Sequence, residues 1–164
     1  MSKSCVSAGE NAPPPVPFAT TLFVRDHCLC LHTQRAARAI SRRFDEALRP
    51  VGLKSGQFSA LISLNRPQAP TLGSVARLLA MDRTTLTANL KPLEREGLVE
   101  VKADEKDKRA RRLHLTQKGR ALLAQAAPIW TATHEAIEAD FGRDANRLRD
   151  DLNAFLEAPK PEKG

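Results

Sequence analysis

The segment HCLCLHTQR, from His27 to Arg35, places two cysteines and two histidines within six consecutive positions. Such side chains can bind a metal ion, form a disulfide, respond to oxidation or pack inside a helix. Residues two apart on a helix point about 200° away from each other, so Cys28 and Cys30 would lie on opposite faces of one helix. The closer pairs, His27 with Cys30 and Cys28 with His32, each supply two of the four ligands that a structural zinc ion needs. We therefore predict no metal site in this segment.

Cys30 belongs to an apolar stripe that predicts a long helix over residues 20–49. Members of the stripe recur every three or four residues and fall within about 80° of one another. They are Cys30, Thr33, Ala37, Ile40, Phe44 and Leu48. Pro50 and Gly52 are expected to end the helix. Cys30 should then face inward, as a sensor thiol or as ordinary packing, whereas Cys28 points the other way and has no predicted role.

Composition favours a cytoplasmic protein that is not an enzyme. The 164 residues carry a net charge of +7, contain no apolar run near the ~20 residues of a membrane helix, and begin without the apolar core of a secretion signal. Cytoplasmic thiols are normally reduced, and three cysteines make a poor disulfide framework. The sequence lacks a nucleophile–base–acid set, a glycine-rich phosphate loop and an HExxH motif, so we predict no catalytic residue, no cofactor and no metal.

Three short helices are expected next, over residues 55–66, 72–80 and 83–95. Asp82 is a suitable N-cap for the third helix, and Gly97 lies where a glycine commonly ends one. The period then changes, because LVEVKA and RRLHLT alternate apolar and polar residues as strands do, on either side of the polar turn DEKDKRA. Short helices followed by a hairpin are the order of a winged helix-turn-helix.

Two further helices complete the expected fold, over residues 117–141, with Thr116 as the cap and a bend at Pro128, and over residues 145–156. The fold class is thus mainly α, with a winged helix-turn-helix core, a small β-hairpin wing and long flanking helices. We divide the chain into a disordered arm (1–17), an N-terminal dimerisation helix (18–52), a DNA-binding domain (53–116), C-terminal dimerisation helices (117–157) and a disordered tail (158–164).

The helix over residues 83–95 has two contrasting faces. Leu86, Leu90 and Leu93 share one face and should pack on the core. The opposite face is short and polar near its start and basic further on, and comprises Thr84, Thr87, Ala88, Lys91 and Arg95. We predict that this face reads DNA, together with Arg83 and Thr85 at the start of the helix. Threonine suits base edges and the thymine methyl group, the later basic residues suit phosphate, and Arg83 suits either.

The wing is strongly basic, with seven basic residues against one acidic residue between Lys106 and Arg120. An arginine on a narrow hairpin can enter the minor groove, where the negative potential is strongest. We expect DNA contacts from Lys106, Lys108, Arg109 and Arg111, with Arg112 adding to the charge of the wing. Asp107 is expected to hold a neighbouring arginine in a charge-assisted pair, and Asp104 suits the turn.

The segment DEKDKRARRLHLTQKG resembles the wing signature of the MarR family of bacterial transcriptional regulators. The matching positions are Asp104, Asp107, Arg109, Leu113, Leu115, Thr116 and Gly119, and LEREGLVE resembles the junction before the wing. The resemblance covers residues 26–155 and implies a homodimer that binds a pseudo-palindromic operator, usually as a repressor. By motif position it implies that Arg109 is the wing arginine and that Thr84, Thr85 and Thr87 begin the recognition helix.

Apolar stripes on the last two helices agree with the homodimer. A twofold partner is the simplest place to bury them, because they lie far along the chain from the winged core. The expected interface residues are Leu122, Ile129, Trp130, Ile137, Phe141, Leu148, Leu152 and Phe155.

Two signals remain open for the release of DNA. The segments LCL and TLTANLK resemble the branch of the family that senses organic hydroperoxides, which implies that Cys30 is the reactive thiol. That branch surrounds its cysteine with tyrosines, and this chain has no tyrosine. The alternative signal is a small aromatic acid, bound between the winged core and the dimerisation helices.

A second function class also remains open, namely a non-specific architectural DNA-binding protein. Such a protein would need basic faces more than a threonine-rich reading helix, so we favour the sequence-specific regulator. The predicted partners are therefore double-stranded DNA, a second copy of the chain, and an aromatic ligand or organic hydroperoxide.

Overall fold

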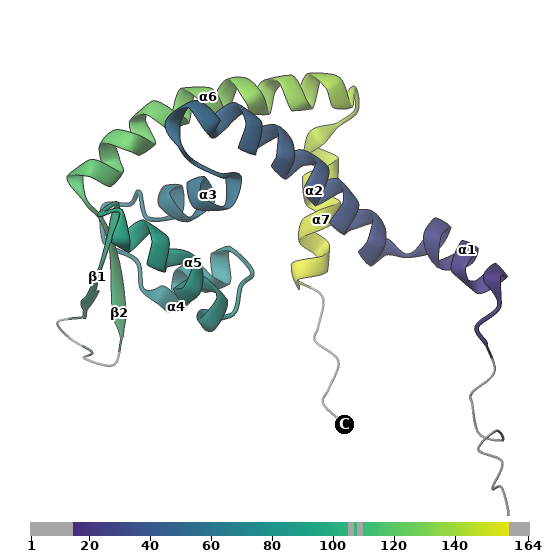
Figure 1. Ribbon diagram of the computed structural model, residues 1–164, viewed down its shortest axis with the longest axis horizontal. Helices are drawn as coiled ribbons and strands as arrows, with labels where there is room; N and C mark the ends of the chain where they lie inside the picture. Colours follow the sequence, from purple (N-terminus) through teal and green to yellow (C-terminus); the bar gives the residue numbers. More distant parts are fainter. Residues whose placement is uncertain (1–14, 105–106, 108–109, 158–164) are drawn as a thin grey trace, which may run out of the picture. The chain divides into compact units, whose positions relative to one another are not determined.

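The computed structural model describes residues 15–104, 107 and 110–157, which divide into two compact units between Arg38 and Ala39. The elements are α1 (Phe18–His27), α2 (Leu29–Leu48), the 3-10 turn η1 (Arg49–Val51), α3 (Ser55–Ser63), α4 (Leu72–Leu78), α5 (Arg83–Arg95), β1 (Val99–Ala103), β2 (Arg111–Leu115), α6 (Gln117–Phe141) and α7 (Ala145–Glu157). Figure 1 labels the α-helices and strands. The fold class expected from the sequence, mainly α with a winged helix-turn-helix core, is confirmed.

The first unit corrects the expectation of one unbroken helix over residues 20–49. The backbone of Cys28 is extended, with φ −73° and ψ 105°, and separates α1 from α2. The Cys28 thiol accepts a hydrogen bond from the backbone N–H of Leu31 at 3.4 Å, as the N-cap side chain of a helix does. The apolar stripe that predicted the helix begins at Cys30, after this break, so it carried no information about where the helix starts.

The apolar stripe predicts that Cys30 is buried and Cys28 exposed, but the single chain shows the opposite order of exposure. Cys30 is exposed, whereas Cys28 is half-buried. The prediction that Cys30 faces inward is therefore wrong for the isolated chain, because no described element of its own unit packs over that face of α2. The two cysteines also do not occupy opposite faces of one continuous helix, since Cys28 lies outside the helical backbone.

The winged core in the second unit follows the predicted order closely. Helix α5 has the predicted bounds, and Asp82 caps it by accepting a hydrogen bond from the Thr85 N–H at 2.8 Å. Strands β1 and β2 pair antiparallel, with Val99 opposite Leu115 at one end and Ala103 opposite Arg111 at the other. Helix α3 ends earlier than predicted, which leaves a loop over residues 64–71 before α4, and α4 also ends two residues early.

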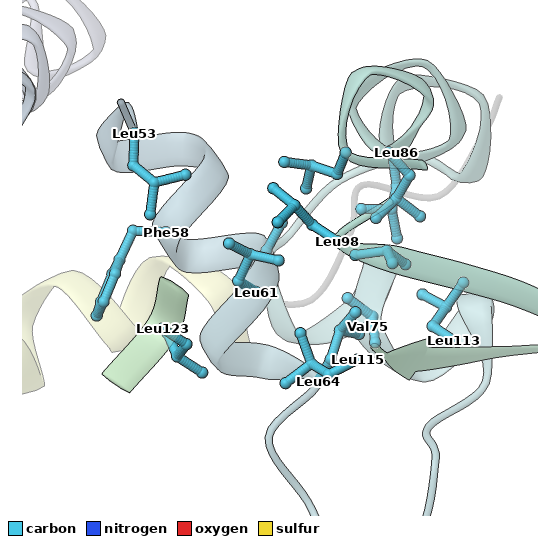
Figure 2. Packing of buried hydrophobic residues seen from close by; sticks show 14 of the residues in the cluster. Leu53, Phe58, Leu61, Leu64, Val75, Leu86, Leu98, Leu113, Leu115 and Leu123 are labelled. Atoms are coloured by element: carbon cyan, nitrogen blue, oxygen red, sulfur yellow. The ribbon is translucent and has the colours of Figure 1, made fainter. Parts of the chain in front are cut away.

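Apolar side chains from every element of the winged core, most of them leucines, meet in one cluster. Figure 2 shows Leu61 of α3, Leu86 of α5 and Leu113 of β2 converging with their neighbours. Each of these three is fully buried. Leu123 of α6 joins the same cluster, so the start of the long helix is fixed to the DNA-binding core.

Helix α6 runs as one element through Pro128 and ends at Phe141, followed by the C-cap residue Gly142, whose φ is +61°. Thr116 caps its start as predicted, by accepting a hydrogen bond from the Gly119 N–H at 3.0 Å. Helix α7 follows after a short turn and has no buried residue. In the described part of the chain, no helix is both long and apolar enough to cross a membrane.

Candidate nucleic-acid interface

Helix α5 presents a buried apolar face and an exposed polar face, as the sequence predicts. Leu86, Leu90 and Leu93 are buried in the core. The seven residues proposed to read DNA are all exposed: Arg83, Thr84, Thr85, Thr87, Ala88, Lys91 and Arg95. The structure therefore leaves all seven accessible, as side chains that contact DNA must be.

Two of the threonines already use their hydroxyl hydrogens within the protein. Thr85 Oγ1 donates to Asp82 at 2.6 Å, and Thr87 Oγ1 donates to the carbonyl oxygen of Arg83 at 2.7 Å. The Thr85 side-chain hydrogen bond, with a second bond from its N–H, lowers the pKa of Asp82. Each of these threonines can still accept a hydrogen bond from DNA through its hydroxyl oxygen and contact DNA through its methyl group. Thr85 also stabilises the start of α5.

Arg83 lies against the first turn of α4, a contact that the sequence did not indicate. A Cβ atom built at Gly73 would stand 3.2 Å from Nη2 of Arg83 and 3.6 Å from its Cζ. The absence of a side chain at Gly73 thus leaves room for the guanidinium beside α4. Both helices of the helix-turn-helix pair therefore define where Arg83 can point.

The base of the wing is organised around the carboxylate of Asp104, which is 7% exposed. One oxygen accepts a hydrogen bond from the Asp107 N–H at 3.0 Å, as expected for a turn residue, and the other pairs with Nε of Arg112. Nη1 of Arg112 also donates to the carbonyl oxygen of Ala69 at 2.7 Å. The sequence predicted only that Arg112 adds to the positive charge of the wing. It did not predict the contact with Ala69, because no local pattern relates two residues so far apart in the chain.

The outer part of the wing falls mostly outside the described residues. Lys106, Lys108 and Arg109 are among the residues that the structure does not describe, so their DNA contacts stay predictions. The proposed pairing of Asp107 with a neighbouring arginine stays a prediction for the same reason. Arg111 begins β2 and is exposed.

A cavity of about 660 Å³ lies behind the DNA-binding elements, between α3, α4 and α6. Its apolar lining comes from Phe58, Ile62, Leu78, Leu79, Ala127 and Trp130. Trp130 stacks nearly parallel to both Phe44 and Phe58, with ring centroids 5.9 and 5.8 Å away. Phe58 and Trp130 both line the cavity and give it an aromatic wall that suits an aromatic guest.

The proposed dimer residues separate into two groups in the single chain. Leu122, Ile129 and Trp130 pack at the edge of the core of their own chain. The others lie on α6 beyond that core or on α7, where Phe141, Leu148, Leu152 and Phe155 are exposed and Ile137 is half-buried. In the first half of α6 the apolar stripe therefore packs against the core of its own subunit. In the second half of α6 the stripe is partly or fully exposed.

Comparison with known proteins agrees with this architecture. Residues 53–110 match the profile of the MarR family. The DNA complex of the Mycobacterium tuberculosis transcriptional regulator MosR is 40% identical, with a TM-score of 0.73 over 80% of this chain and 96% of that one. The chain belongs to the MarR family.

Curated MarR-type relatives span most of the chain. The organic hydroperoxide resistance transcriptional regulator of Bacillus subtilis is 29% identical over 129 residues, which cover 79% of this chain and 87% of the relative. The transcriptional activatory protein BadR of Rhodopseudomonas palustris is 30% identical over 147 residues, which cover 86% and 79%. This MarR-family protein is accordingly a DNA-binding transcriptional regulator and not an enzyme.

Proposed function

We propose that the protein is a homodimeric repressor that binds a pseudo-palindromic operator and is released by a chemical signal. The observation that carries this proposal is the exposed face of α5. Its first turn is rich in threonine, which suits base edges in the major groove, and its later turns are basic, which suits phosphate. Two such helices related by a twofold axis would contact half-sites about one helical turn apart, roughly 34–36 Å.

Exposed apolar residues on α7 support the homodimer. Leu148 and Leu152 are 38% and 42% exposed, and Phe155 and Leu156 are 62% and 67% exposed. A second copy of the chain that packs on this helix would remove their side chains from water, a favourable change of about 25 cal/mol per Å² of apolar surface. We infer that residues 18–52 and 117–157 dimerise, while residues 53–116 bind DNA.

Footprinting on duplexes selected from a random library tests the function. The proposal expects a discrete, roughly palindromic protected site of two half-sites. Sequence-independent protection at the same protein concentration would instead identify the alternative, a non-specific architectural DNA-binding protein. Salt titration of the two modes provides a second criterion, because non-specific binding depends almost wholly on phosphate contacts.

For the signal, we propose a small aromatic carboxylic acid bound in the cavity between α3, α4 and α6. The cavity has the volume of an ordinary ligand site, and its aromatic wall suits a ring. Benzoate, salicylate and 3-phenylpropionate can be screened by quenching of Trp130, the single tryptophan of the chain. We expect an acid that binds here to quench Trp130 fluorescence and to weaken operator binding. If acids release the operator without quenching Trp130, the ligand site is not this cavity.

Oxidation of Cys30 is the second candidate signal, and its exposure favours it. Cys30 is exposed and therefore accessible to an oxidant, and Nε2 of Gln34 donates a hydrogen bond to its sulfur at 3.1 Å. Similarity to the organic hydroperoxide resistance regulator of Bacillus subtilis points in the same direction. We assign Cys30 rather than Cys28, because the Cys28 sulfur is half-buried and caps α2.

Cysteine variants separate the two signals. If Cys30 is the sensor, cumene hydroperoxide should release operator from the wild type and from Cys28→Ser, but not from Cys30→Ser. Release of Cys30→Ser by the peroxide would exclude this thiol, and a wild type that ignores peroxide would exclude thiol sensing.

A further inference from the structure

The loop over residues 64–71, between α3 and α4, lies between the apolar cavity and the wing. On one side Arg66 lines the cavity. On the other side residues 66–71 line a smaller hollow of about 510 Å³ together with Arg112 of β2. Arg66 borders both spaces, so this short loop separates the proposed ligand site from a DNA-contacting element.

Backbone hydrogen bonds attach the wing to this loop. The Leu113 N–H donates to the carbonyl oxygen of Pro70 at 3.0 Å, and Thr71 forms an isolated antiparallel bridge with Arg112. The loop thus pairs with β2 through one isolated bridge and one further backbone hydrogen bond, outside the two-stranded sheet. Because β2 is bonded to the loop along its middle, the wing cannot shift without breaking these bonds or carrying the loop with it.

Arg112 adds a side-chain clamp to the backbone contacts. Its guanidinium pairs with Asp104 within the wing and donates to the Ala69 carbonyl oxygen in the loop. Asp104 in turn fixes the turn through the Asp107 N–H. One planar, multi-donor side chain therefore joins the turn of the wing to the loop, a geometry that a lysine ammonium cannot reproduce.

Arg66 adds a positively charged side chain to the lining of the cavity. Among the described residues that line the cavity, it is the one with a charged side chain. A ligand whose ring lies against Phe58 and Trp130 could place a carboxylate at the Arg66 end, where a charge-assisted pair with guanidinium is strong and directional. An uncharged ligand of the same shape would lack this contact with the loop.

We propose that the loop over residues 64–71 couples the cavity to the wing, with Arg66 as the ligand-carboxylate partner and Arg112 as the positioning residue that transmits the shift. This inference rests on the proposed response to an aromatic acid. A carboxylate drawn to Arg66 moves the loop, and the Ala69 and Pro70 carbonyl groups carry β2 with it. The ligand then favours the protein conformation in which the wing no longer fits the groove, and operator affinity falls.

The decisive measurement is the coupling factor, the ratio of operator Kd with and without saturating 3-phenylpropionate. Binding of the acid is followed separately, through Trp130 fluorescence. In the wild type we expect a factor within the usual 5- to 150-fold range, roughly. Arg112→Lys keeps the charge of the wing but loses the clamp. It should bind the acid as the wild type does, and its coupling factor should fall to within about twofold of one.

Lys102→Arg is the matched control, because it exchanges the same two residue types on β1, where Lys102 stands opposite Arg112. It should keep the wild-type coupling factor. A second pair of probes tests Arg66: Arg66→Gln should weaken binding of 3-phenylpropionate and leave binding of its uncharged amide unchanged. Equal losses for both compounds would contradict the carboxylate contact.

Each failure has a distinct signature. If the acid quenches Trp130 and releases operator but Arg112→Lys keeps the wild-type coupling factor, the loop is not the coupling element. If the acid neither quenches Trp130 nor releases operator from the wild type, the proposed ligand site fails and the inference fails with it. Should Arg112→Lys not fold, hydrogen exchange in the wild type decides: the acid should change protection of the Leu113 amide, and unchanged protection overturns the coupling.

Discussion

The backbone of Gly119 packs directly against the carbonyl group of Leu98, so that a methyl group at Gly119 would overlap the Leu98 oxygen. This contact holds the first turn of α6 against the junction between α5 and β1. Thr116 strengthens the same junction, because its N–H donates to the Leu98 carbonyl at 3.1 Å and its hydroxyl donates to Gly97 at 2.7 Å. The long helix is therefore joined to the wing at a point where only glycine fits.

Gly119→Ala should destabilise the protein, because backbone on both sides of the contact would have to move. Overpacking of this kind costs about 1–3 kcal/mol in the free energy of unfolding. Gly56→Ala is the matched control, since Gly56 lies in α3 with open space around its Cα. That variant should gain roughly 0.5–1 kcal/mol from the lower backbone entropy of alanine. Urea denaturation of both variants checks the prediction, and equal stability of the two would contradict it.

The two ends of the α5 face should affect DNA binding in different ways. Lys91→Ala should weaken binding to all duplexes alike and reduce the slope of log Kd against log salt by about 0.9, because one phosphate contact is lost. Thr84→Val keeps the shape and charge of the residue but removes its hydroxyl. It should leave the salt slope unchanged and relax the preference at one base pair by about 1–3 kcal/mol. Fluorescence anisotropy on the selected operator and its single-base variants measures both quantities.

A change in salt slope for Thr84→Val, or altered base preference for Lys91→Ala, would reverse these assignments. The assignments matter because the proposed regulator and the architectural alternative differ in this respect. A sequence-independent protein would show phosphate effects at Lys91 and no base-specific effect at Thr84.

Burial of the α7 stripe in a dimer can be tested with a single added charge. Leu152→Asp places a carboxylate in the stripe, whereas Asn153→Asp places the same charge on the neighbouring exposed position. If α7 dimerises, sedimentation should show Leu152→Asp dissociating at protein concentrations where the wild type and Asn153→Asp remain dimeric. A burial penalty of several kcal/mol for an unpaired charge makes a large effect the expectation. Equal behaviour of the two variants would place the interface elsewhere.

Local patterns in the sequence were sufficient to predict α5, its Asp82 cap, the hairpin and the Thr116 cap. Each of these depends on residues within a few positions of one another, where helix capping and strand alternation operate. The helix break at Cys28 could not be predicted in this way, because a cysteine is not a typical cap and the apolar period continues beyond it.

Contacts between residues far apart in the chain could not be predicted, because local sequence patterns do not show which distant residues meet in the fold. The role of Arg112 depends on Ala69, which lies 43 positions earlier, and its neighbours on the strand suggested only a basic wing. Likewise, the space for Arg83 depends on Gly73, in another helix. The exposed face of α5 was predictable from its amphipathic pattern, whereas the groups that orient its first arginine become visible only in the fold.

The junction of α6 and α7 should respond to acid through Glu138. This carboxylate pairs with the guanidinium of Arg149 and lies 3.2 Å from Nε2 of His134, and the hydrogen bond from Arg149 is the main reason that the pKa of Glu138 is lowered. A lowered pKa in the folded state means that the pairing stabilises the fold above the unfolded pKa, about 4.3 for glutamate, and that this contribution is lost as the pH falls through the folded value.

Thermal unfolding of the wild type and Glu138→Gln should therefore differ at neutral pH and converge as the pH falls below about 4. Glu135→Gln, an exposed position on the same helix, is the control and should follow the wild type more closely. Because Glu138 is still partly exposed to solvent, the difference should also shrink with added salt, as it does for surface ion pairs. A difference that persists unchanged at low pH would show that Glu138 acts through its shape or helix propensity and not through its charge.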